Sequence, residues 1–266
     1  MKISLLQMQI KLGDFLYNQT TIQRLIETAM SASPQIIALP EMWNIGFFPR
    51  PLEAYADPDG EQCQSFLSKL AKQYQVHIVG GSIARISNQQ FYNTNYTFDH
   101  TGTLIATYDK VHLFSPAKED RLFTAGNHLS VFKLAGIRCA VIICYDIRFS
   151  ELVRSLALEG IDLLFVVAAW PVERQMHWEI LNQARAIENQ CFVAAINGSG
   201  TFHKFHLCGY SMLINPWGEI LTKAGETESI ITADLNMDTL KEIRNHINVF
   251  NDRHPELYFQ PMKNDR

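Results

Sequence analysis

Three apolar segments of the chain run directly into residues that could do chemistry, which are Glu41, Cys144 and Trp170. Continuous apolar runs of this kind are typical of strands that are buried on both faces. In α/β proteins, ligands collect outside the carboxyl ends of parallel strands. If the three strands are parallel neighbours, a carboxylate, a thiol and an indole therefore meet at one edge of the sheet. The three segments are residues 36–39, 140–143 and 163–169.

Cys144 lies between a predicted strand, residues 137–144, and a predicted helix, residues 149–158. The partial positive charge of a helix N-terminus favours the thiolate form and so lowers the pKa of a nearby cysteine. The backbone N–H of Tyr145 is free to point at an oxyanion. This position makes Cys144 a candidate nucleophile, although a free cysteine is also common as a small buried hydrophobe. We interpret the other four cysteines in that second way: Cys63, Cys139, Cys191 and Cys208.

Glu41 and Lys110 each allow a functional and a structural interpretation. A carboxylate that follows an apolar strand is costly to bury. Glu41 is therefore either an acid–base group or a residue that caps a helix or forms a salt bridge. Lys110 ends a predicted strand, residues 103–110, where a lone lysine is typical of a solvated charge. Neither residue decides between these interpretations by itself.

Taken together, these residues resemble the signature segments of the nitrilase superfamily of carbon–nitrogen hydrolases. Three segments carry the resemblance in the expected order: Leu39-Pro40-Glu41, Tyr108-Asp109-Lys110-Val111-His112-Leu113 and Cys144-Tyr145-Asp146-Ile147-Arg148-Phe149-Ser150-Glu151. The resemblance continues through Ala184-Arg185-Ala186-Ile187-Glu188-Asn189, Gly209-Tyr210-Ser211 and Asn215-Pro216-Trp217-Gly218-Glu219. It therefore covers nearly the whole chain.

The resemblance implies a fold and a catalytic triad. The fold is a four-layer α-β-β-α sandwich that works without a metal or another cofactor. In the triad, Glu41 is the general base, Lys110 stabilises the oxyanion and Cys144 is the nucleophile. This division of roles is chemically coherent for amide hydrolysis, because a thiolate attacks the carbonyl while a carboxylate moves the protons.

The resemblance and the position beside the triad also suggest further site residues. Glu119 matches a second family glutamate, which positions the lysine or the substrate, although it could instead be a surface acid within a charged cluster. Met42, Tyr145 and Trp170 are predicted to form pocket walls. Arg148 and the residue three positions later, Glu151, are predicted to form an ion pair.

Among the branches of the superfamily, the chain looks most similar to the ω-amidases, which release ammonia from the distal amide of 2-oxoglutaramate or 2-oxosuccinamate. Nitrilases usually have Cys-Trp at the nucleophile, where this chain has Cys144-Tyr145. The alternatives are an aliphatic amidase, an N-carbamoyl amidohydrolase, a nitrilase, or a catalytically quiet binding protein with the same fold. For an ω-amidase, Arg50 and Arg174 are candidates to bind the distal carboxylate, since a guanidinium holds a carboxylate in two places.

The elements that must position these residues can be read from alternating apolar runs and turn signals. About a dozen strands and five helices are expected along the chain. A single open sheet of that many strands would be awkward, because twisted sheets tend to split into packed layers. We therefore expect two packed sheets with helices outside, within one domain over residues 1–266. Residues 42–60, rich in proline and aromatic residues, form either a lid over the pocket or a pinned surface loop.

Composition excludes several classes of protein. Apolar residues make up 47% of the 266 residues and charged residues 19%, which excludes intrinsic disorder. A net charge of −4 argues against a general nucleic-acid binder. The apolar runs are shorter than the roughly 20 residues that a membrane span needs. His203 and His206 have a spacing found in metal sites, but no further cluster completes one.

The remaining expectations concern compartment and assembly. The five cysteines are odd in number and lack a Cys-x-x-Cys pair, which argues for a reducing, cytoplasmic environment. The first residues do not form an apolar stretch that ends at a small-residue cleavage site, so no secretion signal is predicted there. The partners predicted are a small-molecule amide substrate and a second copy of the chain. Family members commonly form homodimers through the helices expected at residues 149–158 and 173–188.

Overall fold

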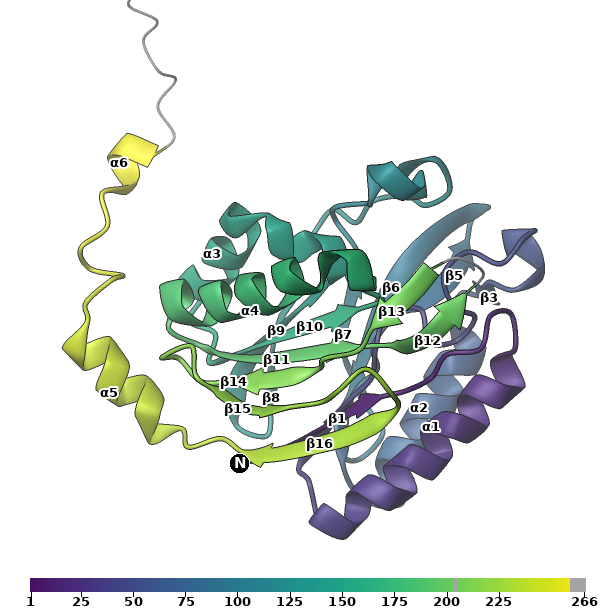
Figure 1. Ribbon diagram of the computed structural model, residues 1–266, viewed down its shortest axis with the longest axis horizontal. Coiled ribbons are helices and arrows are strands. Elements are labelled where there is room, and N and C mark those ends of the chain that lie inside the picture. The colour runs from purple at the N-terminus through teal and green to yellow at the C-terminus, as the bar shows by residue number, and fades with distance from the viewer. Residues whose placement is uncertain (203–204, 259–266) are drawn as a thin grey trace, which may run out of the picture.

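Two β-sheets pack face to face in the centre of the molecule, and a pair of helices covers the outer face of each (Figure 1). The structure is a computed structural model that describes residues 1–202 and 205–258. The predicted four-layer α-β-β-α sandwich is confirmed. The covering helices are α1 (Phe15–Ala29) and α2 (Glu61–Tyr74) on one side, and α3 (Ser150–Leu158) and α4 (Gln175–Asn189) on the other.

The first sheet has eight strands in the order β16-β1-β2-β4-β6-β5-β3, with β7 also paired to β6. Its centre is parallel, from β1 through β2 to β4, and its remaining pairs with β6, β7 and β16 are antiparallel. The strands are β1 (Lys2–Gln7), β2 (Ile36–Ala38), β3 (Asp57–Pro58), β4 (His77–Val79), β5 (Ile83–Ser87), β6 (Gln90–Phe98), β7 (Leu104–Asp109) and β16 (Ser229–Asp234).

The second sheet has six strands in the order β15-β14-β11-β10-β9-β8, and β9, β10 and β11 are parallel neighbours. A separate two-stranded hairpin, β12 with β13, lies against Gln9 and Pro171 through isolated bridges. The strands are β8 (Val131–Leu134), β9 (Ile137–Ile143), β10 (Leu163–Ala168), β11 (Phe192–Asn197), β12 (Ser199–Phe202), β13 (Phe205–Cys208), β14 (Met212–Ile214) and β15 (Ile220–Lys223).

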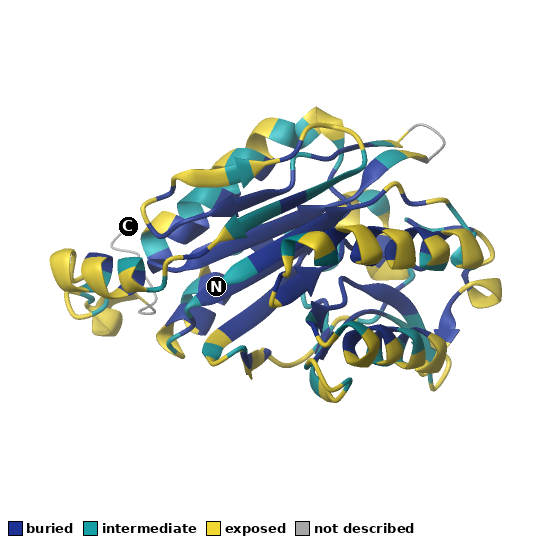
Figure 2. Ribbon diagram, turned by 90° about the horizontal axis from the view of Figure 1, so that it is seen from below, coloured by how far each residue is buried: buried dark blue, intermediate teal, exposed yellow. Residues whose placement is uncertain are grey.

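Side-chain alternation along β2 divides its residues between two core clusters. Ile36 and Ala38 belong to the cluster that joins both sheets and the inner faces of α3 and α4, whereas Ile37 belongs to the core beneath α1 and α2. Successive side chains of a strand point to opposite faces, so a fully apolar strand supplies both layers. Figure 2 shows the consequence, since the strands are buried while the outer faces of the helices are exposed.

Two glycine-containing segments separate neighbouring strands. Gly80, Gly81 and Ser82 lie between β4 and β5. Gly198 lies between β11 and the β12–β13 hairpin. Beyond the sandwich lie α5 (Asp238–His246) and α6 (Pro255–Tyr258). No helix in the described part of the chain is long and apolar enough to cross a membrane.

Candidate active site

The site lies between the two sheets, and each sheet contributes part of it. Glu41 follows β2 and Lys110 follows β7 in the eight-stranded sheet, while Cys144 follows β9 in the six-stranded sheet. Strands β9 and β10 are parallel neighbours as expected, but β2 belongs to the other sheet. Glu41, Cys144 and Trp170 were expected to meet if their strands were parallel neighbours in one sheet. The strands belong to two sheets, and their ends meet across the sandwich.

Hydrogen bonds across the sheets hold Glu41 in place. The backbone N–H of Ala169 donates to Glu41 Oε2 at 2.8 Å, and the N–H of Glu41 donates to the carbonyl of Ala168 at 3.3 Å. The chain around Glu41 rests on Gly81, which has a φ of 61°. A Cβ atom at Gly81 would lie 2.0 Å from the carbonyl oxygen of Pro40, so only glycine permits this approach.

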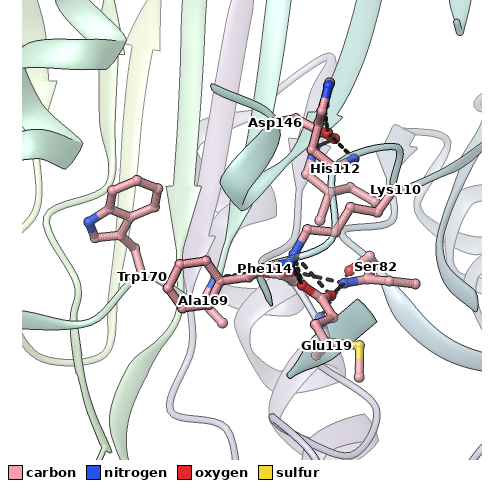
Figure 3. Close-up of polar contacts among 12 residues, drawn as sticks. Ser82, Lys110, His112, Phe114, Glu119, Asp146, Ala169 and Trp170 are labelled. Atoms are coloured by element: carbon pink, nitrogen blue, oxygen red, sulfur yellow. Dashed lines mark hydrogen bonds and ion pairs between the residues drawn. The ribbon is translucent and has the colours of Figure 1, made fainter. Parts of the chain in front are cut away.

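Lys110 is fully buried between the carboxylates of Glu41 and Glu119. Figure 3 shows its side chain directed at Glu119. Its Nζ lies 2.9 Å from Glu41 Oε1, and 3.0 and 2.9 Å from the two oxygens of Glu119. Desolvation, the largest single influence, lowers the pKa of Lys110, but the negative charges of Glu119 and Glu41 outweigh it and raise this pKa well above its ordinary value. The lysine is therefore a fixed positive charge at neutral pH.

Glu119 is not a surface acid, because its side chain is fully buried. It accepts a 2.6 Å hydrogen bond from the backbone N–H of Phe114 in addition to the bonds from Lys110. Asn93, a residue of β6 that the sequence analysis missed, donates its side-chain amide to Glu41 at 2.8 Å and to Glu119 at 3.3 Å. The alternation of asparagine and threonine in an otherwise strand-forming segment is the signal that could have revealed it.

Cys144 is the first residue of a 3-10 turn, η5 (Cys144–Arg148), and its side chain is nearly buried. Its φ of 49° lies in the left-handed region, which is costly for a residue with a side chain and persists only where the surroundings enforce it. Such positions are found most often at functional sites.

The prediction that a helix N-terminus lowers the pKa of Cys144 is wrong. Helix α3 begins only at Ser150. Burial raises the pKa of the Cys144 thiol well above its ordinary value, and the adjacent Glu41 raises it further, whereas Lys110 lowers it. The thiol is therefore protonated at rest and needs a base, and the neighbouring carboxylate of Glu41 is the candidate.

A cavity of about 270 Å³ opens onto Cys144. This volume is at the small end of the range of ligand sites, roughly 300–1,000 Å³, and so suits a small molecule. Tyr145 and Trp170 line the cavity as predicted. Met42 does not, because its φ of 53° turns the side chain into an apolar cluster with Ile45 and Leu52. The rest of the wall is largely apolar: Phe47, Phe48, Phe114, Ala117, Phe205 and Leu207.

Three arginines also line this cavity: Arg50, Arg148 and Arg174. The guanidinium of Arg148 lies 4.8 Å from the ring centre of Trp170, and that of Arg174 lies 5.2 Å from the ring centre of Phe114. Among the described residues, none of the three forms an ion pair with an acidic side chain. The predicted pair between Arg148 and Glu151 is therefore wrong, since Arg148 turns toward the cavity instead.

The donor set of the site suits acid–base chemistry more than metal binding. Within residues 1–202 and 205–258, no group of three or more histidine, cysteine, aspartate or glutamate side chains could hold a metal ion. His203, one member of the histidine pair noted in the sequence, lies outside the described residues.

Comparison with known proteins identifies a family and several relatives that match nearly the whole chain. The family model described as carbon-nitrogen hydrolase matches residues 2–245. A 2-oxoglutaramate amidase of Bacillus subtilis (strain 168) is 41% identical over 256 residues, which cover 96% of this chain and 98% of that protein. An omega-amidase of Homo sapiens is 35% identical over 274 residues, covering 98% of each chain.

Among solved structures, the chain is similar to a variant of the amidase from Nesterenkonia sp. AN1, in which acrylamide has undergone Michael addition at the active-site cysteine. The two share 27% identity with a TM-score of 0.82, over 92% of this chain and 97% of the other.

Proposed function

The chain belongs to the carbon–nitrogen hydrolase family, and on that premise we propose that it is an amidase for a short dicarboxylic acid monoamide. In this proposal the distal amide of a substrate such as 2-oxoglutaramate or 2-oxosuccinamate becomes a carboxylate, and ammonia leaves. The observation that carries the proposal is the presence, in the cavity that holds Cys144, of three arginines that form no ion pair with any acidic side chain described in the structure. The name of the Bacillus subtilis relative supports the same substrate class.

The first half of the reaction forms a thioester on Cys144. Glu41 Oε1 already accepts bonds from Lys110 and Asn93, whereas Oε2 accepts one from Ala169, so Oε2 keeps a lone pair for the thiol proton. The sulfur attacks the amide carbon, and the carbonyl electrons move to oxygen. The ammonium of Lys110 and the backbone N–H of Tyr145, which lies in the first turn of η5, stabilise this oxyanion.

The second half releases the acid. The oxyanion collapses, the carbon–nitrogen bond breaks, and Glu41 returns its proton to the departing nitrogen, which leaves as ammonia. Water then enters, Glu41 takes one of its protons, and the hydroxide attacks the thioester carbon. When this second oxyanion collapses, the carbon–sulfur bond breaks and the sulfur recovers a proton from Glu41. Glu119 and Asn93 position Lys110 and Glu41 throughout.

Substrate choice follows from charge in the cavity. A dicarboxylic acid monoamide presents one carboxylate beyond the reacting amide, and the guanidinium groups of Arg148 and Arg174 offer planar paired donors for it. Butyramide has a similar length but no carboxylate. Loss of a desolvated charge contact typically costs about 2–5 kcal/mol, so succinamate should exceed butyramide at least about tenfold in kcat/KM.

The test compares these two substrates in the wild-type enzyme and in variants, by ammonia release. Arg174→Leu and Arg148→Lys should lower kcat/KM for succinamate about tenfold or more and leave butyramide within about threefold. Arg24→Leu, which removes an arginine paired with Glu228 outside the cavity, is the matched control. Equal turnover of butyramide, or a preference for nitriles or N-carbamoyl compounds, would assign the chain to an aliphatic amidase, nitrilase or carbamoylase branch.

The proposal extends to assembly and compartment. A second copy of the chain would cover apolar side chains on α4 that are exposed in this structure, Met176, Ile180 and Ile187. Light scattering at micromolar concentration would give the mass of two chains, whereas a single-chain mass contradicts the dimer.

Five unpaired cysteines support a cytoplasmic, reducing location. One core shared by both sheets supports a single domain.

A further inference from the structure

Asp146 is a fully buried carboxylate two residues after Cys144, and the triad chemistry does not use it. Its Oδ2 accepts hydrogen bonds from the hydroxyl of Tyr108 at 2.8 Å and from the backbone N–H of Ile143 at 3.0 Å. Its Oδ1 accepts from the backbone N–H of His112 at 2.9 Å and from the ring Nδ1 of His112 at 2.8 Å. Figure 3 shows His112 directed at Asp146 beside Lys110.

The residues that hold Asp146 flank Lys110 symmetrically along the chain. Tyr108 lies in β7, which ends at Asp109, and precedes Lys110 by two residues, whereas His112 follows Lys110 by two residues in the bend after the strand. The side chains of Tyr108 and His112 both reach Asp146 in η5, the turn that follows β9 and begins at Cys144. A single carboxylate therefore ties the segment that carries the lysine to the turn that carries the nucleophile.

The two tied segments come from different sheets, so no backbone ladder fixes their separation. Strand β7 pairs with β6 in the eight-stranded sheet, and β9 pairs with β8 and β10 in the six-stranded sheet. The His112 ring is further fixed by stacking on Phe149, with ring centres 3.6 Å apart and planes 9° apart. Phe149 itself donates its N–H to the carbonyl of Asp146 at 3.0 Å.

Cys144 needs such support because its left-handed backbone conformation is strained. Without it, the turn could relax and carry the sulfur away from the oxyanion site. Arg185 also holds this turn, through two hydrogen bonds of 2.9 and 2.8 Å to the carbonyl of Ile147. Aromatic contacts of His112 with Phe149 and of Phe114 with Tyr145 join the turn to the lysine segment, and the Asp146 carboxylate adds side-chain hydrogen bonds to Tyr108 and His112 of that segment.

We propose that Asp146, with Tyr108 and His112, is a positioning device that sets the separation between the Cys144 sulfur and the Lys110 ammonium. Its catalytic consequence rests on the proposed amidase function, whereas its effect on the thiol does not. Asp146 touches neither the thiol nor the carbonyl that is attacked, and it acts through the η5 turn. Its loss should therefore reduce kcat and the reactivity of Cys144 more than it weakens substrate binding.

For each variant, the melting temperature and the circular dichroism spectrum are recorded first, to show that the protein is folded. Two further properties are then measured. The first is the rate of Cys144 carboxymethylation by iodoacetamide, followed by peptide mass without any substrate. The second is ammonia release from succinamate, separated into kcat and KM. The variants are Asp146→Asn, Tyr108→Phe, and Tyr108→Phe with His112→Phe, which keeps a ring for stacking on Phe149. Ser4→Ala removes a part-buried 2.7 Å hydrogen bond to Thr232, and since neither residue lines the cavity or contacts Asp146, it is the matched control.

Asp146→Asn should lower kcat about 100-fold, as expected for a misplacement near 1 Å, with KM within about threefold. Alkylation of Cys144 should slow about fivefold or more, and Tyr108→Phe should show a smaller change of the same kind. Ser4→Ala should lower the melting temperature without changing either rate.

Folded Asp146→Asn with wild-type kcat and wild-type alkylation overturns the proposal. If Asp146→Asn does not fold, wild-type behaviour of the Tyr108→Phe/His112→Phe variant overturns it equally. If the wild-type protein hydrolyses none of the amides tested while Asp146→Asn still slows alkylation, the proposed function fails and the positioning device stands.

Discussion

Replacing Lys110 with methionine tests the centre of the proposed mechanism and separates its structural from its catalytic contribution. In the wild-type protein the lysine stands within 2.9–3.0 Å of both Glu41 and Glu119, and all three side chains are fully buried. Removing one partner from a buried ionic group typically costs about 3–5 kcal/mol, because the remaining charges stay uncompensated. For a chain of this size, about 2–4 °C per kcal/mol gives a fall in melting temperature of roughly 6–20 °C.

The same substitution removes the positive charge from the oxyanion site. Loss of one preorganised oxyanion donor costs about 10²–10³-fold in kcat. Stability and activity therefore both fall, and a loss of activity alone would not show whether the lysine acts on the substrate. A second substitution distinguishes the two effects, because Lys110→Met/Glu119→Gln removes one of the two stranded carboxylates and so relieves their repulsion.

The double variant should regain most of the lost melting temperature and none of the lost kcat. The assay is ammonia release from succinamate, with thermal unfolding measured in the same buffers. If the double variant recovers activity together with stability, Lys110 is a structural cation and the assigned oxyanion role is refuted.

Much of the site could be predicted from the sequence because its members follow recognisable strands. Glu41 and Cys144 were candidates from their positions at strand ends, whereas the roles of Lys110 and Glu119 came from the resemblance to the nitrilase superfamily. Periodicity also indicates that a strand is buried on both faces. It does not say which sheet the strand joins, and for that reason β2 was expected beside β9 when it lies in the other sheet.

The wrong predictions concern side chains whose direction is set by a single backbone angle or by a tertiary contact. Met42 follows Glu41 directly, but its positive φ turns its side chain away from the cavity. Arg148 is three residues before Glu151 on the chain, yet the ring of Trp170, brought by β10, provides its actual contact. The same spatial folding placed Asp146 against Tyr108 and His112, and only the two-residue spacings around Lys110 and Cys144 hinted at it.

Three further predictions follow from the chemistry of the site. Cys144→Ala should abolish ammonia release with little change in melting temperature, and retained activity in this variant would contradict its role as nucleophile. Glu41→Gln keeps the shape but not the base, so kcat should fall by at least about 10²–10⁴-fold, and a near wild-type rate would remove Glu41 from the mechanism. The last prediction concerns alkaline pH. The pKa of Lys110 in the folded protein is raised well above the ordinary value of 10.5. Between these two values the folded state holds a proton that the unfolded state has lost, so stability falls as pH rises through this window. The difference in unfolding free energy between the wild type and Lys110→Met should thus stay constant from about pH 8 to about pH 10 and shrink above it. Urea unfolding across this range measures the difference, and one that is flat to the highest pH at which both proteins fold would show that Lys110 is not held as a buried cation.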